Sequence, residues 1–248
     1  INVNKEDNYL PNLNEIPRSV LEKTIAFFFC SPTNPQGSVA DEDYLLKLYS
    51  LAIEYNFLII SDECYSEIYR SSAPKSILQI SEKNNFENVL SLNSLSKRSN
   101  APGLRSGFVA GNENLINELF NLRNIAAPTV PIPIQIASEY LWSDEMHVIE
   151  NRKLYNDKFD IFYKNIDIGF DFKIPEGGFF VWLDISKYGN DEEITIKLWK
   201  SGMKVIPGSY LSIESASLSN SSNYIRIALV GNSEDINQAT IKLNRLAF

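Results

Sequence analysis

Short apolar runs alternate with one amphipathic segment in the first half of the chain. The runs IAFFFC, at residues 25–30, and FLIIS, at residues 57–61, are typical of strands that are covered on both faces. Between them, apolar residues recur at intervals of three and four, after the acidic residues Asp41, Glu42 and Asp43, which favour a helix N-terminus. The apolar face of this predicted helix comprises Tyr44, Leu45, Leu48, Leu51, Ala52 and Tyr55. The pattern predicts a strand, helix, strand unit with two parallel strands.

The runs NVLSLNS, at residues 88–94, and RSGFVAG, at residues 105–111, predict two further strands. Residues 138–165 are rich in charge and apolar at helical intervals, and they predict long helical structure after the turn-forming APTVPIPIQ. Beyond this point shorter strands and helices alternate. We therefore predict an α/β fold, with a large domain of mostly parallel sheet flanked by helices, residues 1–150, and a smaller C-terminal α+β domain, residues 151–248.

Composition narrows the class of protein. The chain has 248 residues, of which 44% are hydrophobic, enough for one large core and a satellite. The formal charge of −8 is spread along the chain without a basic stripe, which argues against a nucleic acid partner. No apolar run approaches the roughly 20 residues of a membrane span, and the beginning has no signal pattern, so we expect a cytoplasmic protein away from membranes.

The chain contains few residues for metal or thiol chemistry. His147 is the only histidine, which argues against a multi-histidine metal site and against a nucleophile with a histidine base; we expect it to be solvated on a helix. Cys30 and Cys64 lie in or beside apolar runs, which favours two reduced, buried thiols over a disulfide framework, with a redox pair as the alternative.

Polar motifs follow directly on the predicted strands. SPTNPQG follows the first, SDECYSEIY the second and SLSKRSNAPGLR the third. The carboxyl ends of parallel strands meet at one edge of a sheet, where ligands bind. These motifs are expected to bring five side chains to one rim, namely Asn34, Asp62, Tyr65, Lys97 and Arg105.

The order Asn-Pro-x-Gly, Asp-Glu-x-Tyr, Ser-x-Ser-Lys and Pro-Gly-x-Arg resembles the class I/II pyridoxal phosphate aminotransferases of fold type I. The later motifs PEGGFFVWLD, MKVIPGSYL and NYIRIAL resemble that family's small-domain motifs, in the same order. The resemblance implies pyridoxal 5'-phosphate as cofactor, amino acid and keto acid substrates, and a homodimer.

Lys97 is the candidate for the bond to the cofactor, because an amine condenses reversibly with an aldehyde. Ser94 and Ser96 offer hydroxyl donors, and Arg105, carried back by the Pro-Gly turn, offers a planar fork suited to an anionic phosphate. A solvated surface lysine after a strand is the alternative interpretation of Lys97.

Asp62 would oppose the pyridine nitrogen and keep it protonated, so that the ring accepts electrons. Tyr65 and Asn34 resemble the pair of residues that bind the phenolic oxygen of the ring in this family. Without the resemblance, Asp62 could cap a following helical segment, Tyr65 could be core packing, and Asn34 could simply belong to a turn.

Arg226 lies in an apolar strand, on the face opposite Ile225 and Ile227. The resemblance implies that it binds the substrate α-carboxylate in bidentate fashion, with an exposed edge-strand arginine as the alternative. Gly177 and Gly178 resemble part of the pocket wall, and a strand bulge is the competing interpretation.

The motif SLSKRSNAPGLRSGFVAG is similar to the N-succinyldiaminopimelate aminotransferases, which implies transamination with glutamate on a route to lysine. Aspartate, alanine and aromatic aminotransferases share most of these residues, and a related lyase is a further alternative. Family members are longer at the N terminus. The resemblance implies that a first strand, a phosphate-binding loop, a ring-stacking aromatic residue and an N-terminal arm are absent here, so an inactive fragment also remains open.

Overall fold

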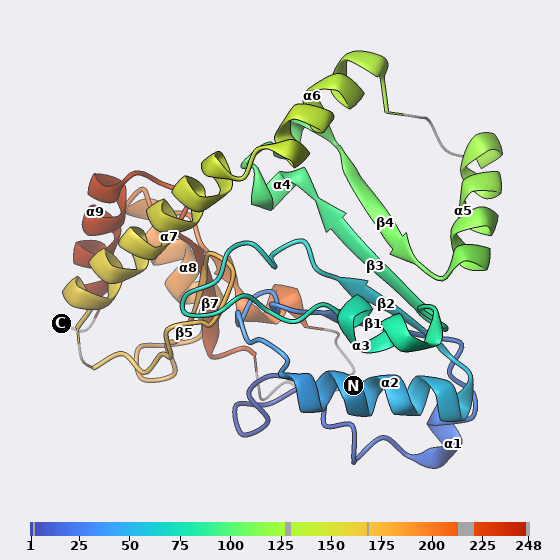
Figure 1. Ribbon diagram of the computed structural model, residues 1–248. Helices are drawn as coiled ribbons and strands as arrows, with labels where there is room; N and C mark the ends of the chain where they lie inside the picture. Colours follow the sequence, from blue (N-terminus) through green and yellow to red (C-terminus); the bar gives the residue numbers. More distant parts are fainter. Residues whose placement is uncertain (2, 127–129, 168, 213–220, 247–248) are drawn as a thin grey trace.

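The computed structural model of the protein describes residues 1, 3–126, 130–167, 169–212 and 221–246. A four-stranded sheet in the order β1-β2-β3-β4 forms the centre of the larger part (Figure 1). Its strands are β1 (Ala26–Cys30), β2 (Leu58–Asp62), β3 (Val89–Ser94) and β4 (Gly107–Gly111). The first three strands run parallel, and β4 runs antiparallel to β3. The α/β fold with a mostly parallel sheet is thus confirmed.

Helix α2 (Glu42–Tyr55) confirms the predicted amphipathic helix. The carboxylate of Asp41 caps it by accepting a hydrogen bond of 2.8 Å from the backbone N–H of Tyr44. Leu45, Leu48 and Ala52 are buried on one face of α2. They share a core with the sheet residues Phe27, Phe29, Ile59 and Val89. Because side chains alternate along a strand, this core lies on one face of the sheet.

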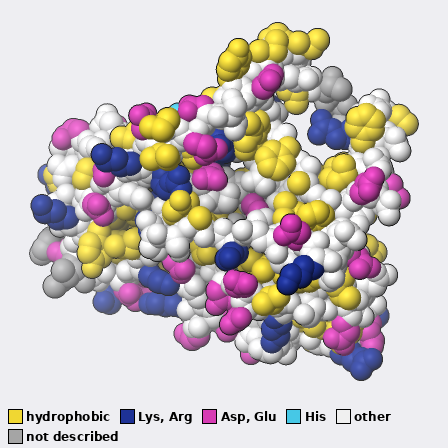
Figure 2. Space-filling view, viewed as in Figure 1, with side chains coloured by type: hydrophobic (Ala, Val, Ile, Leu, Met, Phe, Trp, Pro, Cys, Tyr) yellow, Lys and Arg dark blue, Asp and Glu magenta, His cyan; other side chains and the backbone are white. Residues whose placement is uncertain are grey.

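The opposite face of the sheet is less covered. Phe28, which points away from the core, is 77% exposed. Helix α5 (Glu113–Ala126) has no buried residue, and Ile125 on it is 91% exposed. Figure 2 shows apolar side chains gathered on the outer surfaces of α5 and α6 (Ile132–Ser143). Among these exposed apolar residues, Ile132 on α6 is 71% and Tyr140 on α6 is 72% exposed.

The structure corrects the prediction for residues 127–165. Residues 127–129 lie outside the described part, but α6 begins inside the predicted turn. Pro131 occupies its N-cap position and makes no side-chain capping bond, and Pro133 lies in its first turn, where a missing N–H costs nothing. The predicted single helix is two, α6 and α7 (Met146–Asn165), separated at Asp144, which is extended. The carboxylate of Asp144 accepts a hydrogen bond of 2.9 Å from the N–H of Met146.

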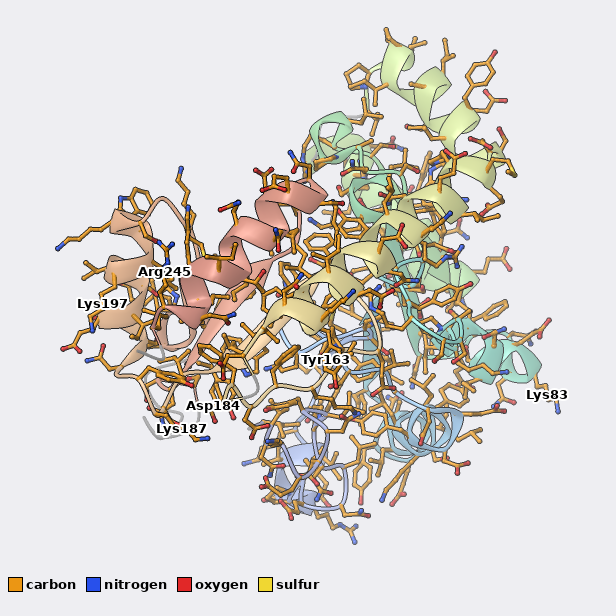
Figure 3. All side chains as sticks on the ribbon, turned by 90° about the vertical axis from the view of Figure 1, so that its left-hand side faces the viewer. Lys83, Tyr163, Asp184, Lys187, Lys197 and Arg245 are labelled. Atoms are coloured by element: carbon orange, nitrogen blue, oxygen red, sulfur yellow. The ribbon has the colours of Figure 1, made fainter. Side chains whose placement is uncertain are left out.

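A second sheet, of order β5-β7-β6 and antiparallel throughout, forms the smaller part. Its strands are β5 (Phe180–Asp184), β6 (Ile206–Pro207) and β7 (Tyr224–Ala228). Helices α8 (Asp191–Lys200) and α9 (Ser233–Asn244) and the end of α7 enclose its core. Figure 3 shows α7, with Tyr163, running between this part and the large sheet. The predicted division at residue 150 falls within α7 and stays a prediction.

Short helical segments complete the described chain. These are α1 (Arg18–Leu21), α3 (Ile77–Ser81), α4 (Leu95–Arg98) and the 3-10 turns η1 (Glu82–Asn84), η2 (Pro102–Leu104) and η3 (Gly208–Leu211). Across the described ranges, the helices are all too short or too polar to cross a membrane.

Candidate active site at the edge of the parallel sheet

The predicted residues lie at one edge of the large sheet. Asn34 follows the end of β1, Asp62 is the last residue of β2, and Lys97 follows β3 in α4. Register places Cys30 beside Asp62 at this edge. Arg105 comes just before β4, and because β4 is antiparallel to β3, its beginning lies beside the end of β3. The sheet therefore brings all four motifs to the same rim, as expected.

The amine of Lys97 lies against two aromatic rings. Its Nζ is 5.1 Å from the ring centroid of Phe179 and 5.8 Å from that of Tyr65. The Lys97 side chain is half-buried, and within the described ranges no carboxylate oxygen lies within 4.0 Å of its Nζ. The amine thus lies against two rings and forms no ion pair among these residues, so none of their carboxylates occupies it.

Tyr65 is at the centre of an aromatic cluster. It is 7% exposed and meets the rings of Phe179 and Phe180 edge to face, with centroids 5.6 Å and 5.8 Å away. Tyr155 of α7 stacks on Phe179 at 5.1 Å. Burial raises the pKa of Tyr65, and the charge of Arg226 opposes that shift. Tyr65 therefore packs in a core and also borders the Lys97 amine.

The charges of Asp62 and Lys97 have opposite effects on the pKa of the Cys64 thiol, which lies near both. The Asp62 carboxylate accepts a hydrogen bond of 3.0 Å from the N–H of Cys64. Burial, together with Asp62, raises the pKa of Cys64 to about 12, while the charge of Lys97 opposes this. Burial and the charge of Asp62 likewise raise the pKa of Cys30 to about 12. Both cysteines are free, as predicted, but only half-buried. The residues after Asp62 form turns, so it caps no helix.

Arg226 joins the small sheet to the rim. Its strand β7 lies between β5 and β6, so the edge-strand alternative is wrong, and the burial of Ile225 and Ile227 on the other face confirms the predicted alternation. The Nη1 of Arg226 donates a hydrogen bond of 3.0 Å to Oδ1 of Asn34, and the guanidinium carbon lies 4.6 Å from the Phe180 ring centroid. Burial lowers the pKa of Arg226, and Tyr65 opposes the shift.

The hydroxyls of the Lys97 loop are bound to one another. Ser94 Oγ accepts a hydrogen bond of 3.1 Å from the N–H of Ser96 at the beginning of α4, and lies 2.9 Å from Ser96 Oγ. It also lies 3.2 Å from the carbonyl oxygen of Ser106. Arg105, which directly precedes Ser106, is exposed, and its Nη1 donates a hydrogen bond of 2.9 Å to the carbonyl of Pro102.

Gly177 and Gly178 precede β5, and Gly177 is in tight contact with the loop that follows β1. The N–H of Gly177 donates to Gly37 at 2.9 Å, and a Cβ on Gly177 would lie 2.4 Å from Pro32 Cγ. Gly178 has a φ of +73°, which favours glycine. The pair is therefore not a bulge within the strand, and the tight contact brings the following residue, Phe179, to the Lys97 amine.

Contacts from α7 to the Lys97 turn escaped the sequence prediction. The Nδ2 of Asn151 donates to the carbonyls of Lys97 and Arg98 at 3.2 Å and 3.3 Å. His147, expected in solvent, instead has Nε2 2.8 Å from Ser99 Oγ. These pairs are about 50 residues apart in sequence, so no local pattern could have identified them. Among the described residues, no group of three side chains could hold a metal ion.

A small hollow lies beside the loop that carries Asn34. Gly37, Trp182 and Tyr224 line it, but Lys97 does not. The hollow is therefore separate from the Lys97 amine.

Comparison with known proteins agrees with this geometry. The family model described as aminotransferase class I and II matches residues 1–243. An LL-diaminopimelate aminotransferase from Natranaerobius thermophilus is 30% identical over 253 residues, covering 96% of this chain and 61% of the relative. A probable aspartate aminotransferase from Methanocaldococcus jannaschii is 26% identical over 245 residues, covering 96% and 62%.

Solved structures show the same likeness. An aminotransferase from Neisseria meningitidis superposes with a TM-score of 0.87 at 37% identity, covering 96% of this chain and 61% of the other. A probable N-succinyldiaminopimelate aminotransferase from Thermus thermophilus, at 22% identity and a TM-score of 0.86, shares the fold. The chain spans about three fifths of the length of these relatives.

Proposed function

Because the chain belongs to the class I and II aminotransferase family, we propose that its rim binds pyridoxal 5'-phosphate and transfers an amino group between an amino acid and a keto acid. The placement of Lys97 carries this proposal. Its amine lies against Tyr65 and Phe179 and forms no ion pair among the described residues. An amine so placed at the end of a parallel sheet is suited to condense with an aldehyde.

The chemistry of the donor set fits the cofactor. Ser94, Ser96 and Arg105 offer hydroxyl and guanidinium donors for a phosphate, once Arg105 releases the Pro102 carbonyl. Asp62 supplies a carboxylate to hold a proton on the pyridine nitrogen. When bound, the cofactor supplies a ring that accepts electrons from the substrate carbon.

Lys97 has two roles in this proposal. It would hold the aldehyde of the cofactor, and as a free amine it would move a proton at the substrate α-carbon. Phe179 and Tyr65 exclude water from one side of the amine. The turn that carries Lys97 is held by Asn151, so the amine keeps its position.

Arg226 binds the substrate α-carboxylate through its planar fork. Its contact with Asn34 uses Nη1, which orients the guanidinium while other N–H groups remain for the substrate. The side-chain amide of Asn34 and the hydroxyl of Tyr65 would offer hydrogen bonds to the phenolic oxygen of the cofactor. The raised pKa of Tyr65 keeps its hydroxyl protonated for that role.

For substrates, we propose glutamate as donor and a keto acid of the succinyldiaminopimelate type, in lysine biosynthesis, as acceptor. The Lys97 motif and relatives named for diaminopimelate support this choice. Relatives named for aspartate keep that amino acid as the competing donor. We also propose a homodimer in the cytoplasm, and the exposed apolar residues of α5 support the dimer.

Borohydride trapping tests the assignment of Lys97. The chain is incubated with pyridoxal phosphate, reduced and digested, and the labelled peptide is identified by mass spectrometry. We expect the label on Lys97 and its loss in Lys97→Ala. Lys158→Ala is the matched control, because Lys158 also lies over a ring, 4.9 Å from the Tyr155 centroid.

Label on another lysine, or label that persists in Lys97→Ala, would contradict the assignment. A coupled assay for 2-oxoglutarate formed from glutamate then distinguishes transfer from elimination. Label on Lys97 without turnover of any keto acid would identify a chain that binds the cofactor but does not transaminate.

A further inference from the structure

Arg70 is a partly buried cation without a carboxylate partner among the described residues. In the described part of the chain no carboxylate oxygen lies within 4.0 Å of its guanidinium, and the charge of Asp160 acts on it from a greater distance. Burial lowers the pKa of Arg70 to about 10, so it remains charged near neutrality. Its Nε is fully buried and makes no hydrogen bond. A buried charge without an ion pair costs free energy, which its hydrogen bonds and its contact with an aromatic ring offset in part.

The contacts of Arg70 join three segments that are far apart in sequence. Nη1 donates to Oδ1 of Asn156 in α7, and Nη2 donates to the carbonyl of Gly178 before β5. The guanidinium carbon lies 4.1 Å from the Phe159 ring centroid. The backbone N–H of Arg70 also donates to the carbonyl of Glu176 at 3.0 Å. Arg70 thus fixes the chain at Gly178 against α7.

Gly178 leads directly to the ring beside the Lys97 amine. Phe179 stacks on Tyr155 and lies 5.1 Å from Lys97 Nζ. Gly178 has a left-handed backbone, so its carbonyl direction and the direction of Phe179 are set together. A donor fixed on that carbonyl therefore also fixes the ring.

We propose that Arg70 is a positioning residue, which through the Gly178 carbonyl holds Phe179 against the Lys97 amine. A guanidinium suits this role because its rigid fork donates in two directions at once, to Asn156 and to Gly178. A lysine at this position donates from a single point, and a methionine fills the volume without donating. The proposal rests on the proposed function only in taking Lys97 as the reactive amine.

Competitive acetylation of the full chain without cofactor tests the proposal. Trace acetic anhydride is added, and acetylation of Lys97 is measured by mass spectrometry relative to Lys83, which projects at the far edge of the molecule (Figure 3). A ring over an ammonium stabilises the charged form by about 0.5–1 kcal/mol, so its loss raises the reactivity of the amine roughly two- to fivefold. We expect that increase in Arg70→Met.

Arg152→Met is the matched control. Arg152 lies on α7 one turn before Asn156. Its guanidinium carbon is 4.1 Å from the Tyr69 ring centroid and its Nη1 is 3.7 Å from a carboxylate oxygen of Glu67, while no hydrogen bond among the described residues joins it to Gly178. We expect its Lys97 reactivity to equal that of the wild type. Equal increases in both variants would show a general loosening and overturn the proposal.

An unchanged Lys97 reactivity in Arg70→Met would also overturn it, even with lower stability. If Arg70→Met does not fold, Arg70→Lys is judged by the same criterion, because it keeps the charge and loses the fork. The measurement uses the Lys97 amine in the chain alone, so its outcome is independent of whether borohydride traps a cofactor there.

Discussion

Replacing Arg226 by lysine keeps the charge at the rim and removes the planar fork. In the structure, one guanidinium nitrogen donates to Asn34 and the carbon lies 4.6 Å from the Phe180 ring centroid, so the fork is oriented before substrate arrives. The ammonium of a lysine has three N–H donors at a single point and no planar fork, so it does not bind two carboxylate oxygens in parallel while it also reaches Asn34. At least one hydrogen bond to a charged group is therefore lost.

Such a bond contributes about 1.5–3 kcal/mol, which corresponds to roughly 10- to 150-fold weaker binding. We expect Arg226→Lys to weaken binding of 2-oxoglutarate to the cofactor-loaded chain by this factor, measured by isothermal titration calorimetry. Arg152→Lys is the control, because it changes another arginine stacked on a ring, outside the rim. Binding by Arg226→Lys within threefold of the wild type would refute the carboxylate fork.

Two further predictions concern stability. Leu48 is 0% exposed in the core of α2, so Leu48→Ala is expected to lower the free energy of unfolding by about 2–5 kcal/mol in urea titrations. Leu46 lies on the outer face of the same helix and is 45% exposed, so Leu46→Ala should change the free energy of unfolding by less than about 0.5 kcal/mol. Equal losses in the two variants would contradict the predicted core. The thiols of Cys30 and Cys64 have pKa values raised from 9.0 to about 12, mainly by burial. The folded chain therefore keeps protons that the unfolded chain releases, and this contribution to stability is present below pH 9 and is lost as the pH rises toward 12. A Cys30→Ala, Cys64→Ala variant should lose less stability than the wild type between pH 8 and pH 11, and equal losses would show that the thiols do not contribute.

The site combines two sheets with different tasks. The large sheet places Lys97 and Asp62 at the ends of neighbouring strands, while the small sheet brings Arg226 to Asn34. Because the fork and the amine belong to separate cores, residues at the junction decide their relative position. Arg70 and Asn151 are such residues, since each joins α7 to a segment of the rim.

The sequence alone predicted the strands of the large sheet, helix α2 and the sheet edge at which Asn34, Asp62 and Lys97 lie. Strand positions follow from short apolar runs, and the α2 N-terminus follows from Asp41, because these signals act over a few residues. The placement of Asn34, Asp62 and Lys97 at one edge follows from parallel pairing, which aligns the ends of consecutive strands. The break between α6 and α7 was not predicted, because the helical pattern continues through Asp144.

Only the tertiary structure decided what surrounds the reactive amine. The Arg226 and Asn34 contact joins residues 192 apart in sequence, and the Arg70 contact with Gly178 joins residues 108 apart. The local patterns that indicate strands and helices carry no information on such pairs, whose distance depends on how two separately packed cores meet. The sequence by itself thus indicated which side chains lie at the edge of the large sheet. The ring beside Lys97 and the orientation of Arg226 arose from packing between the two sheets.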